Sequence, residues 1–135
     1  MHVERFAPSP TGDLHLGHAF SALTAHDAAR AAGGRFLLRM EDLDRSRVRA
    51  EFVEGIERDL RWLGIAWDGP ALFQSERRAA YAAALERLAG RGLAYACACT
   101  RRDIAEAAAA PHEGTPPAGP DGIVYPGTCR GLGLA

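Results

Sequence analysis

The 135-residue sequence contains no lysine, and all 16 of its basic residues are arginine. With 17 acidic residues the net charge is −1, so any contact with RNA must come from a local basic patch. No run approaches the roughly 18 consecutive apolar residues of a membrane span, and we expect no membrane association. The opening residues, MHVERFAPSP, lack the basic and then apolar pattern of a secretory leader, which makes the cytoplasm the expected location.

Cysteine is scarce, with only Cys97, Cys99 and Cys129 present. An odd number of cysteines argues against a disulfide framework. Two thiolates one residue apart can bind one metal ion, and a third with one nitrogen or oxygen ligand would complete a tetrahedral structural zinc site. The alternative is three free thiols that act as small apolar side chains. Chemistry leaves the fourth ligand open between His112, a standard zinc donor, and Tyr125, whose phenol would have to lose its proton.

The first forty residues have the order strand, loop, helix, strand. Apolar residues predict strands over 3–6 and 35–40, and helical spacing predicts a helix from near Gly17 to the Gly33-Gly34 pair. This βαβ unit favours a parallel α/β sheet. The remaining predicted elements are a helix over 48–63, a helix over 75–90 capped by Ser75, a strand over 93–97, a helix opened by a capping box at 100–103, and a loop over 111–120.

The turn after the first strand has the chemistry of a phosphate site. Pro8-Ser9-Pro10-Thr11-Gly12 is followed by His15-Leu16-Gly17-His18 at the start of a helix. A helix N-terminus offers unpaired N–H groups and a positive dipole end, and Gly17 lets a flat ring approach the backbone. The two histidines can donate hydrogen bonds to phosphate oxygens as charge develops. The alternative, two ordinary polar residues near a helix cap, is less favoured because strand, turn and helix meet at this point.

Arg5 and Glu41 each follow a strand, so both belong to the edge where ligands bind in open α/β sheets. Arg5 can form a two-point pair with a carboxylate, and Glu41 can accept hydrogen bonds from an ammonium group. One cation and one anion at neighbouring strand ends suit an amino acid with an extra carboxylate. The alternative is a structural ion pair between the two residues.

These motifs together resemble a known family. The segment from Arg5 to Gly12, with His15-Leu16-Gly17-His18, is similar to the opening of the glutamyl-tRNA synthetases, and the latter four residues match the class I "HIGH" signature. The resemblance covers nearly the whole chain. It implies a Rossmann-type parallel α/β catalytic domain that makes glutamyl-adenylate from glutamate and ATP, with Mg²⁺ accompanying the ATP.

The resemblance also implies a role for each residue of the motifs. The expected catalytic residues are His15, Gly17 and His18. The expected glutamate-binding residues are Arg5, Phe6, Ala7, Pro8, Ser9 and Glu41, and the expected ATP-binding residues are Pro10, Thr11, Gly12, His15, Gly17 and His18.

Two segments resemble the branch of the family that modifies queuosine. Glu41-Asp42-Leu43-Asp44 is closer to this branch than to the ordinary enzymes, and so is the segment from Tyr125 to Arg130. The branch implies zinc ligation by Cys97, Cys99, Tyr125 and Cys129, with zinc bracing an insertion that faces the tRNA. It also implies glutamyl transfer to queuosine in the anticodon loop of tRNA(Asp), whereas the ordinary branch charges tRNA(Glu).

The resemblance divides the chain into the first half of a catalytic domain, residues 1–95, and a zinc-binding insertion, residues 96–135. Class I enzymes also need a lysine-rich "KMSKS" loop, and this sequence has no lysine. The chain is therefore either a fragment or a protein without its second half, and the alternative function is a non-catalytic, zinc-stabilised module that binds RNA or a nucleotide. We expect little adenylation by this chain alone, and a monomer.

Overall fold

The computed structural model describes residues 1–109, 118–119 and 122–133. The chain divides into two compact units, Met1–Ala80 and Tyr81–Ala135, which are described separately. The functional division expected near residue 95 stays a prediction. Within the described ranges, no helix is both long and apolar enough to cross a membrane.

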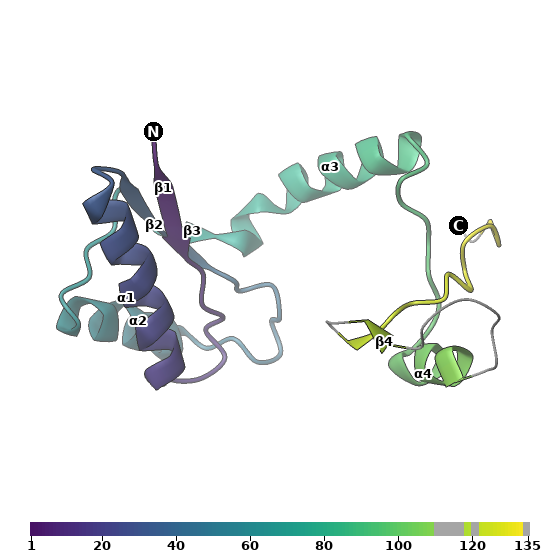
Figure 1. Cartoon of the computed structure of the whole chain (residues 1–135), viewed down its shortest axis with the longest axis horizontal. Helices are drawn as coiled ribbons and strands as arrows, with labels where there is room; N and C mark the ends of the chain where they lie inside the picture. The colour runs from purple at the N-terminus through teal and green to yellow at the C-terminus, as the bar shows by residue number, and fades with distance from the viewer. Residues whose placement is uncertain (110–117, 120–121, 134–135) are drawn as a thin grey trace. The chain divides into compact units, whose positions relative to one another are not determined.

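A small parallel sheet forms the centre of the first unit. Its strands β1 (Val3–Phe6), β2 (Arg35–Met40) and β3 (Leu72–Phe73) lie in the order β1-β2-β3, and both pairings are parallel. The helix α1 (Leu16–Ala31) connects β1 to β2, and α2 (Ala50–Trp62) connects β2 to β3. In Figure 1, β1 and β2 lie side by side with α1 next to them. The predicted α/β class and βαβ order are confirmed.

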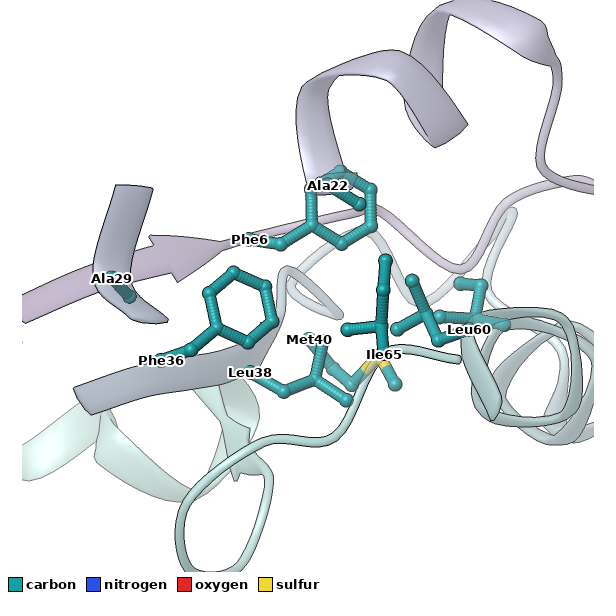
Figure 2. Packing of buried hydrophobic residues seen from close by; sticks show 9 residues of the cluster. Phe6, Ala22, Ala29, Phe36, Leu38, Met40, Leu60 and Ile65 are labelled. Atoms are coloured by element: carbon teal, nitrogen blue, oxygen red, sulfur yellow. The ribbon is translucent and has the colours of Figure 1, made fainter. Parts of the chain in front are cut away.

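Strand alternation separates an apolar face of the sheet from a polar one. Phe6 pairs with Leu38 and faces the core, whereas Arg5 pairs with Leu37 and lies on the opposite face with Arg39. The core contains residues from the strands, from both helices and from the loop after α2, as Figure 2 shows; its buried members are Phe6, Ala22, Ala29, Phe36, Leu38, Met40, Ile56, Leu60 and Ile65.

The two helices reach this core in different ways. α1 buries only Ala22 and Ala29, so its backbone can approach the sheet closely. α2 buries Ile56 and Leu60, which belong to the apolar face predicted from the sequence. Gly64 follows α2 with φ of +77°, a conformation that glycine adopts without the strain of a side chain.

Asp68 connects the loop after α2 to the sheet and to α1 through hydrogen bonds. Its Oδ2 accepts from the Phe36 N–H at 2.8 Å and from Arg30 at 3.1 Å, and Arg30 also donates to the Ala66 carbonyl at 2.7 Å. The hydrogen bond from Phe36 lowers the pKa of Asp68 and so keeps the carboxylate ionised. One carboxylate thus joins α1, β2 and the crossover to β3.

The start of the next helix differs from the prediction. A short 3-10 helix, η1 (Gln74–Arg77), precedes α3 (Arg78–Gly90), and Ser75 is not the N-cap. The Ser75 N–H donates to Asp42 at 2.8 Å, and the Ser75 hydroxyl donates to the other Asp42 oxygen. The serine therefore holds the loop after β2, because a carboxylate distant in sequence uses both of its donors.

The predicted strand over 93–97 is also wrong, since these residues pair with no strand in the part of the chain that the structure describes. Apolar residues alone do not make a strand without a neighbour to accept its hydrogen bonds.

The capping box at the start of α4 (Arg101–Ala109) is confirmed. Thr100 N–H donates to Asp103 Oδ2 at 2.7 Å, and Asp103 N–H donates to Thr100 Oγ1 at 3.2 Å. β4 (Ala118–Gly119) pairs antiparallel with β5 (Gly122–Ile123). The loop predicted over 111–120 lies largely outside the described residues.

Replacement of Phe36 tests the core. Phe36→Ala is expected to lower the free energy of unfolding by about 3–5 kcal/mol, because the side chain is fully buried. Phe20→Ala is the matched control; its side chain is 71% exposed, and the expected loss is within about 0.5 kcal/mol. Urea unfolding followed by tryptophan fluorescence measures both, and equal losses would contradict the placement of Phe36.

Candidate functional site

Two histidines begin α1 with an unusual cap. The Gly17 N–H donates to His15 Nδ1 at 3.1 Å, and the His15 N–H donates to His18 Nδ1 at 3.2 Å. The two rings stack with centroids 3.7 Å apart and planes 22° apart. The imidazoles therefore satisfy helix-terminal N–H groups that a serine or aspartate usually caps.

This cap also fixes the proton on each ring. Because Nδ1 of both rings accepts a hydrogen bond, the neutral form of each carries its hydrogen on Nε2. Both Nε2–H groups are then available as donors to a ligand at the helix N-terminus. Burial and the nearby His15 lower the pKa of His18 below its usual 6.5. The unfolded chain binds this proton more readily, so the stability contributed by neutral His18 is lost as pH falls below about 6.5.

Gly17 packs closely against the His15 ring. A Cβ at this position would lie 3.1 Å from Cε1 and 3.2 Å from Nδ1 of His15, closer than ordinary van der Waals contact. A side chain at Gly17 would therefore displace the ring that accepts the Gly17 N–H. This steric reason adds to the predicted close approach of a ligand.

A cavity of about 280 Å³ lies beside the helix start. Seven of the predicted site residues line it: Phe6, Ala7, Pro8, Ser9, Thr11, Gly12 and His18. Asp13 also lines it and was missed from the sequence, although its place inside the loop was a usable signal. Pro10 is fully buried and supports the loop, while His15 and Gly17 form the neighbouring cap.

Two backbone hydrogen bonds hold this loop against the segment that follows β2. The Glu41 N–H donates to the Pro8 carbonyl at 2.9 Å, and the Arg49 N–H donates to the Pro10 carbonyl at 3.2 Å. Glu41 is thereby placed next to the loop that lines the cavity.

The structural ion pair considered for Arg5 and Glu41 does not form. Glu41 pairs instead with Arg39, two residues earlier on β2. Arg5 is exposed and makes no ion pair among the described residues. The Arg5 guanidinium is therefore available to an anionic ligand, which is the first interpretation drawn from the sequence.

The second unit gathers three thiols and one phenol. The Sγ atoms of Cys97, Cys99 and Cys129 all lie within 4.8 Å of one another, and those of Cys99 and Cys129 are 3.3 Å apart. The Tyr125 hydroxyl lies 3.3 Å from Cys97 Sγ and 3.7 Å from Cys99 Sγ. Gly127, with φ of +79°, forms the turn that brings Cys129 back to Tyr125. The four predicted metal ligands are thus together; His112 lies outside the described residues.

Hydrogen bonds within the cluster shift the pKa values of its groups in opposite directions. The bond with Tyr125 lowers the pKa of Cys129 to about 7, and the bond with Cys129 raises the pKa of Cys99 to about 11. The bond with Cys97 raises the pKa of Tyr125. Cys129 can therefore offer a thiolate near neutral pH.

The spacing of these atoms fits a tetrahedral metal ion. With zinc–sulfur bonds of about 2.3 Å, ligand sulfurs lie roughly 3.8 Å apart, close to the separations observed. The Cys129 N–H also donates to the Tyr125 oxygen at 2.9 Å, which would stabilise a phenolate ligand. The cysteine cluster can hold a metal ion.

A parallel sheet whose first strand leads through a proline-rich loop into a helix defines a Rossmann-type α/β domain. Comparison with known proteins gives the family. The family described as "tRNA synthetases class I (E and Q), catalytic domain" matches residues 2–119. This chain therefore belongs to the catalytic-domain family of class I synthetases for glutamate and glutamine.

Individual relatives agree with this assignment. Two proteins named glutamyl-Q tRNA(Asp) synthetase, from Rhodobacter capsulatus and Nocardia farcinica, are 65% identical over 131 residues and 56% identical over 128. A solved glutamate tRNA ligase from Elizabethkingia meningosepticum, in complex with its amino acid, has a TM-score of 0.61 at 35% identity.

The match covers only part of these proteins. It spans 97% of this chain but 47% of the Rhodobacter capsulatus protein, and 95% of this chain but 38% of the Nocardia farcinica protein. For the solved ligase the shares are 79% of this chain and 23% of that chain. The similarity therefore concerns the part of each protein that matches this chain.

Gly17→Ala tests the histidine cap. In the unchanged chain, nitrogen-15 NMR is expected to show the Nε2–H tautomer for His15 and His18 and a lowered pKa for His18. Gly17→Ala should shift the His15 ring, weaken its tautomer preference and raise the pKa of His18 toward 6.5. Gly12→Ala is the control, since its Cβ meets nothing within 4 Å. The same histidine spectra in both variants would refute this account of Gly17.

Proposed function

We propose that this domain activates glutamate with ATP. The observation that carries the proposal is the histidine cap beside the cavity, where two Nε2–H donors are free at a helix N-terminus. The family membership and the names of the relatives support glutamate as the substrate.

The proposed reaction needs no side-chain nucleophile. An oxygen of the glutamate α-carboxylate attacks the α-phosphorus of ATP, a phosphorus–oxygen bond forms, and the bond to the β-phosphate bridging oxygen breaks. The products are glutamyl-adenylate and pyrophosphate, with Mg²⁺ accompanying the phosphates. The Nε2–H groups of His15 and His18 would stabilise charge on the phosphate oxygens in the transition state. Lysine side chains are absent, so the permanently charged side-chain donors in this chain are arginine guanidinium groups.

Arg5 and Glu41 would bind the amino acid. The free guanidinium of Arg5 suits a carboxylate, and Glu41 suits the ammonium group. The predicted roles of Phe6, Ala7, Pro8 and Ser9 in glutamate binding are compatible with their place along the cavity or at its strand end.

The proposed acceptor of the glutamyl group is a hydroxyl of queuosine in tRNA(Asp). The adenylate carbonyl is attacked by that hydroxyl, an ester forms, and AMP leaves. The names of the two relatives favour this acceptor, and the Glu41-Asp42-Leu43-Asp44 segment agrees with it. Charging of tRNA(Glu) is the second candidate, because the similar solved structure is a glutamate tRNA ligase. We further propose that the protein acts as a cytoplasmic monomer.

For the second unit we propose structural zinc held by Cys97, Cys99, Tyr125 and Cys129. Their convergence and the N–H donated to the Tyr125 oxygen support this set. Zinc would fix the fold of the unit and take no part in the chemistry.

Transfer of labelled glutamate tests the acceptor. The complete product of the gene that contains this sequence is incubated with ATP and with tRNA from cells that contain or lack queuosine. Transfer is expected only to the queuosine-containing pool. Equal transfer to both pools would favour tRNA(Glu) charging, and no transfer to either would favour a non-catalytic binding module.

Substitution of the candidate fourth ligands tests the zinc site. Metal analysis by mass spectrometry is expected to find one zinc per chain, and chelator competition gives its affinity. Tyr125→Phe should weaken zinc binding about tenfold or more, because it removes the oxygen donor. Tyr95→Phe is the matched control, and His112→Ala tests the other candidate; both should bind zinc normally. Zinc loss in His112→Ala alone would assign the ligand to His112, and a zinc-free unchanged chain would refute the site.

A further inference from the structure

The ion pair between Arg39 and Glu41 lies on the polar face of the sheet. The two residues are two positions apart, so their side chains leave β2 and its extension on the same side. Phe36, Leu38 and Met40 face the core on the other side. Arg39 Nη2 donates to Glu41 Oε1, and the two side chains are 29% and 35% exposed. Partial burial makes this contact less screened by solvent than a surface ion pair.

Glu41 is held at its backbone as well as at its carboxylate. Its N–H donates to the Pro8 carbonyl at 2.9 Å, within the loop that lines the cavity. The residue can therefore move little about its backbone, and Arg39 sets where its carboxylate lies. A side chain held at both ends is pre-organised for a ligand.

The Arg39 guanidinium has a donor left for the same carboxylate. Its Nε is buried and has no hydrogen-bond partner among the described residues. Nε and Nη2 lie along one edge of the planar guanidinium, which is the edge that pairs side-on with a carboxylate. A small rotation would turn the single contact into a two-point pair, and the remaining lone pairs of Glu41 could still accept from an ammonium group.

We propose that Arg39 is a positioning and specificity-determining residue for the amino acid. Arg39 holds the Glu41 carboxylate toward the substrate ammonium and neutralises its charge. With Arg5, which has no ion pair in the described part of the chain, these three side chains carry one net positive charge, and the Asp13 carboxylate that lines the cavity adds a negative one. Without Arg39 the same groups would be one unit more negative, which disfavours glutamate, with its two carboxylates, more than neutral glutamine. The inference rests on the proposed activation of glutamate.

Arg39→Met tests this role, because it removes the charge and the donors but keeps the apolar stem. The matched control is Arg35→Met, an arginine at the other end of the same strand. ATP–pyrophosphate exchange by the complete gene product gives KM for glutamate, glutamine and ATP. We expect Arg39→Met to raise KM for glutamate about tenfold or more and to reduce the preference for glutamate over glutamine. KM for ATP should not change, and Arg35→Met should stay within about twofold of the unchanged protein.

Two further variants separate positioning from a general structural effect. In a Glu41→Gln background, Arg39→Met should add little to KM for glutamate, because Arg39 acts through Glu41. Arg39→Lys retains the charge without the planar fork, and its KM for glutamate should rise several-fold. Circular dichroism confirms folding; if Arg39→Met does not fold, Arg39→Lys decides the question.

The outcomes distinguish this inference from the proposed function. Glutamate-dependent exchange with the same KM in Arg39→Met, or in a folded Arg39→Lys when Arg39→Met does not fold, would overturn the role of Arg39 alone. Fully additive effects of Arg39→Met and Glu41→Gln would also overturn it. Absence of glutamate-dependent exchange in the unchanged protein would overturn the proposed function, and the inference with it.

Discussion

The parallel pairing of β1 with β2 is the interaction on which the candidate site depends. It sends both strands in one direction, so the loops that follow them meet at one edge. The hydrogen bond from the Glu41 N–H to the Pro8 carbonyl continues this contact beyond the strands. The buried core beneath, with Phe6 and Leu38 opposite each other, keeps the pairing in register. A slip of one residue would turn Phe6 toward solvent and separate Glu41 from the loop.

Local patterns were sufficient for the βαβ unit and for the cysteine cluster. Buried strands and a glycine-bounded helix have strong sequence signals, and three cysteines in a chain this poor in cysteine restrict the possible metal ligands. The cap of the helix near Ser75 was predicted wrongly because a residue distant in sequence takes the hydrogen bonds of Ser75. Asp42 accepts from both donors of Ser75, and Arg39 pairs with Glu41, which excludes the alternative of an ion pair between Arg5 and Glu41. Neither partner can be identified from the spacing of apolar residues.

The histidine cap joins local folding to the proposed chemistry. The Nδ1 atoms of His15 and His18 satisfy backbone donors at the start of α1, and this leaves both Nε2–H groups outward. A serine cap would start the helix equally well but would offer no such donors. The segment His15-Leu16-Gly17-His18 thus explains the beginning of the helix, the proton position on each ring and the close packing of Gly17 against the His15 ring.

The hydrogen bonds between Ser75 and Asp42 give the molecule a mechanical linkage. Ser75 belongs to η1, which leads directly into α3, and Asp42 is the chain neighbour of Glu41. Burial alone would raise the pKa of Asp42, but the hydrogen bonds from Ser75 outweigh this effect and lower the pKa. The carboxylate therefore stays ionised, and a charged acceptor makes stronger hydrogen bonds to the serine. A displacement of η1 would therefore also displace the segment that contains Glu41.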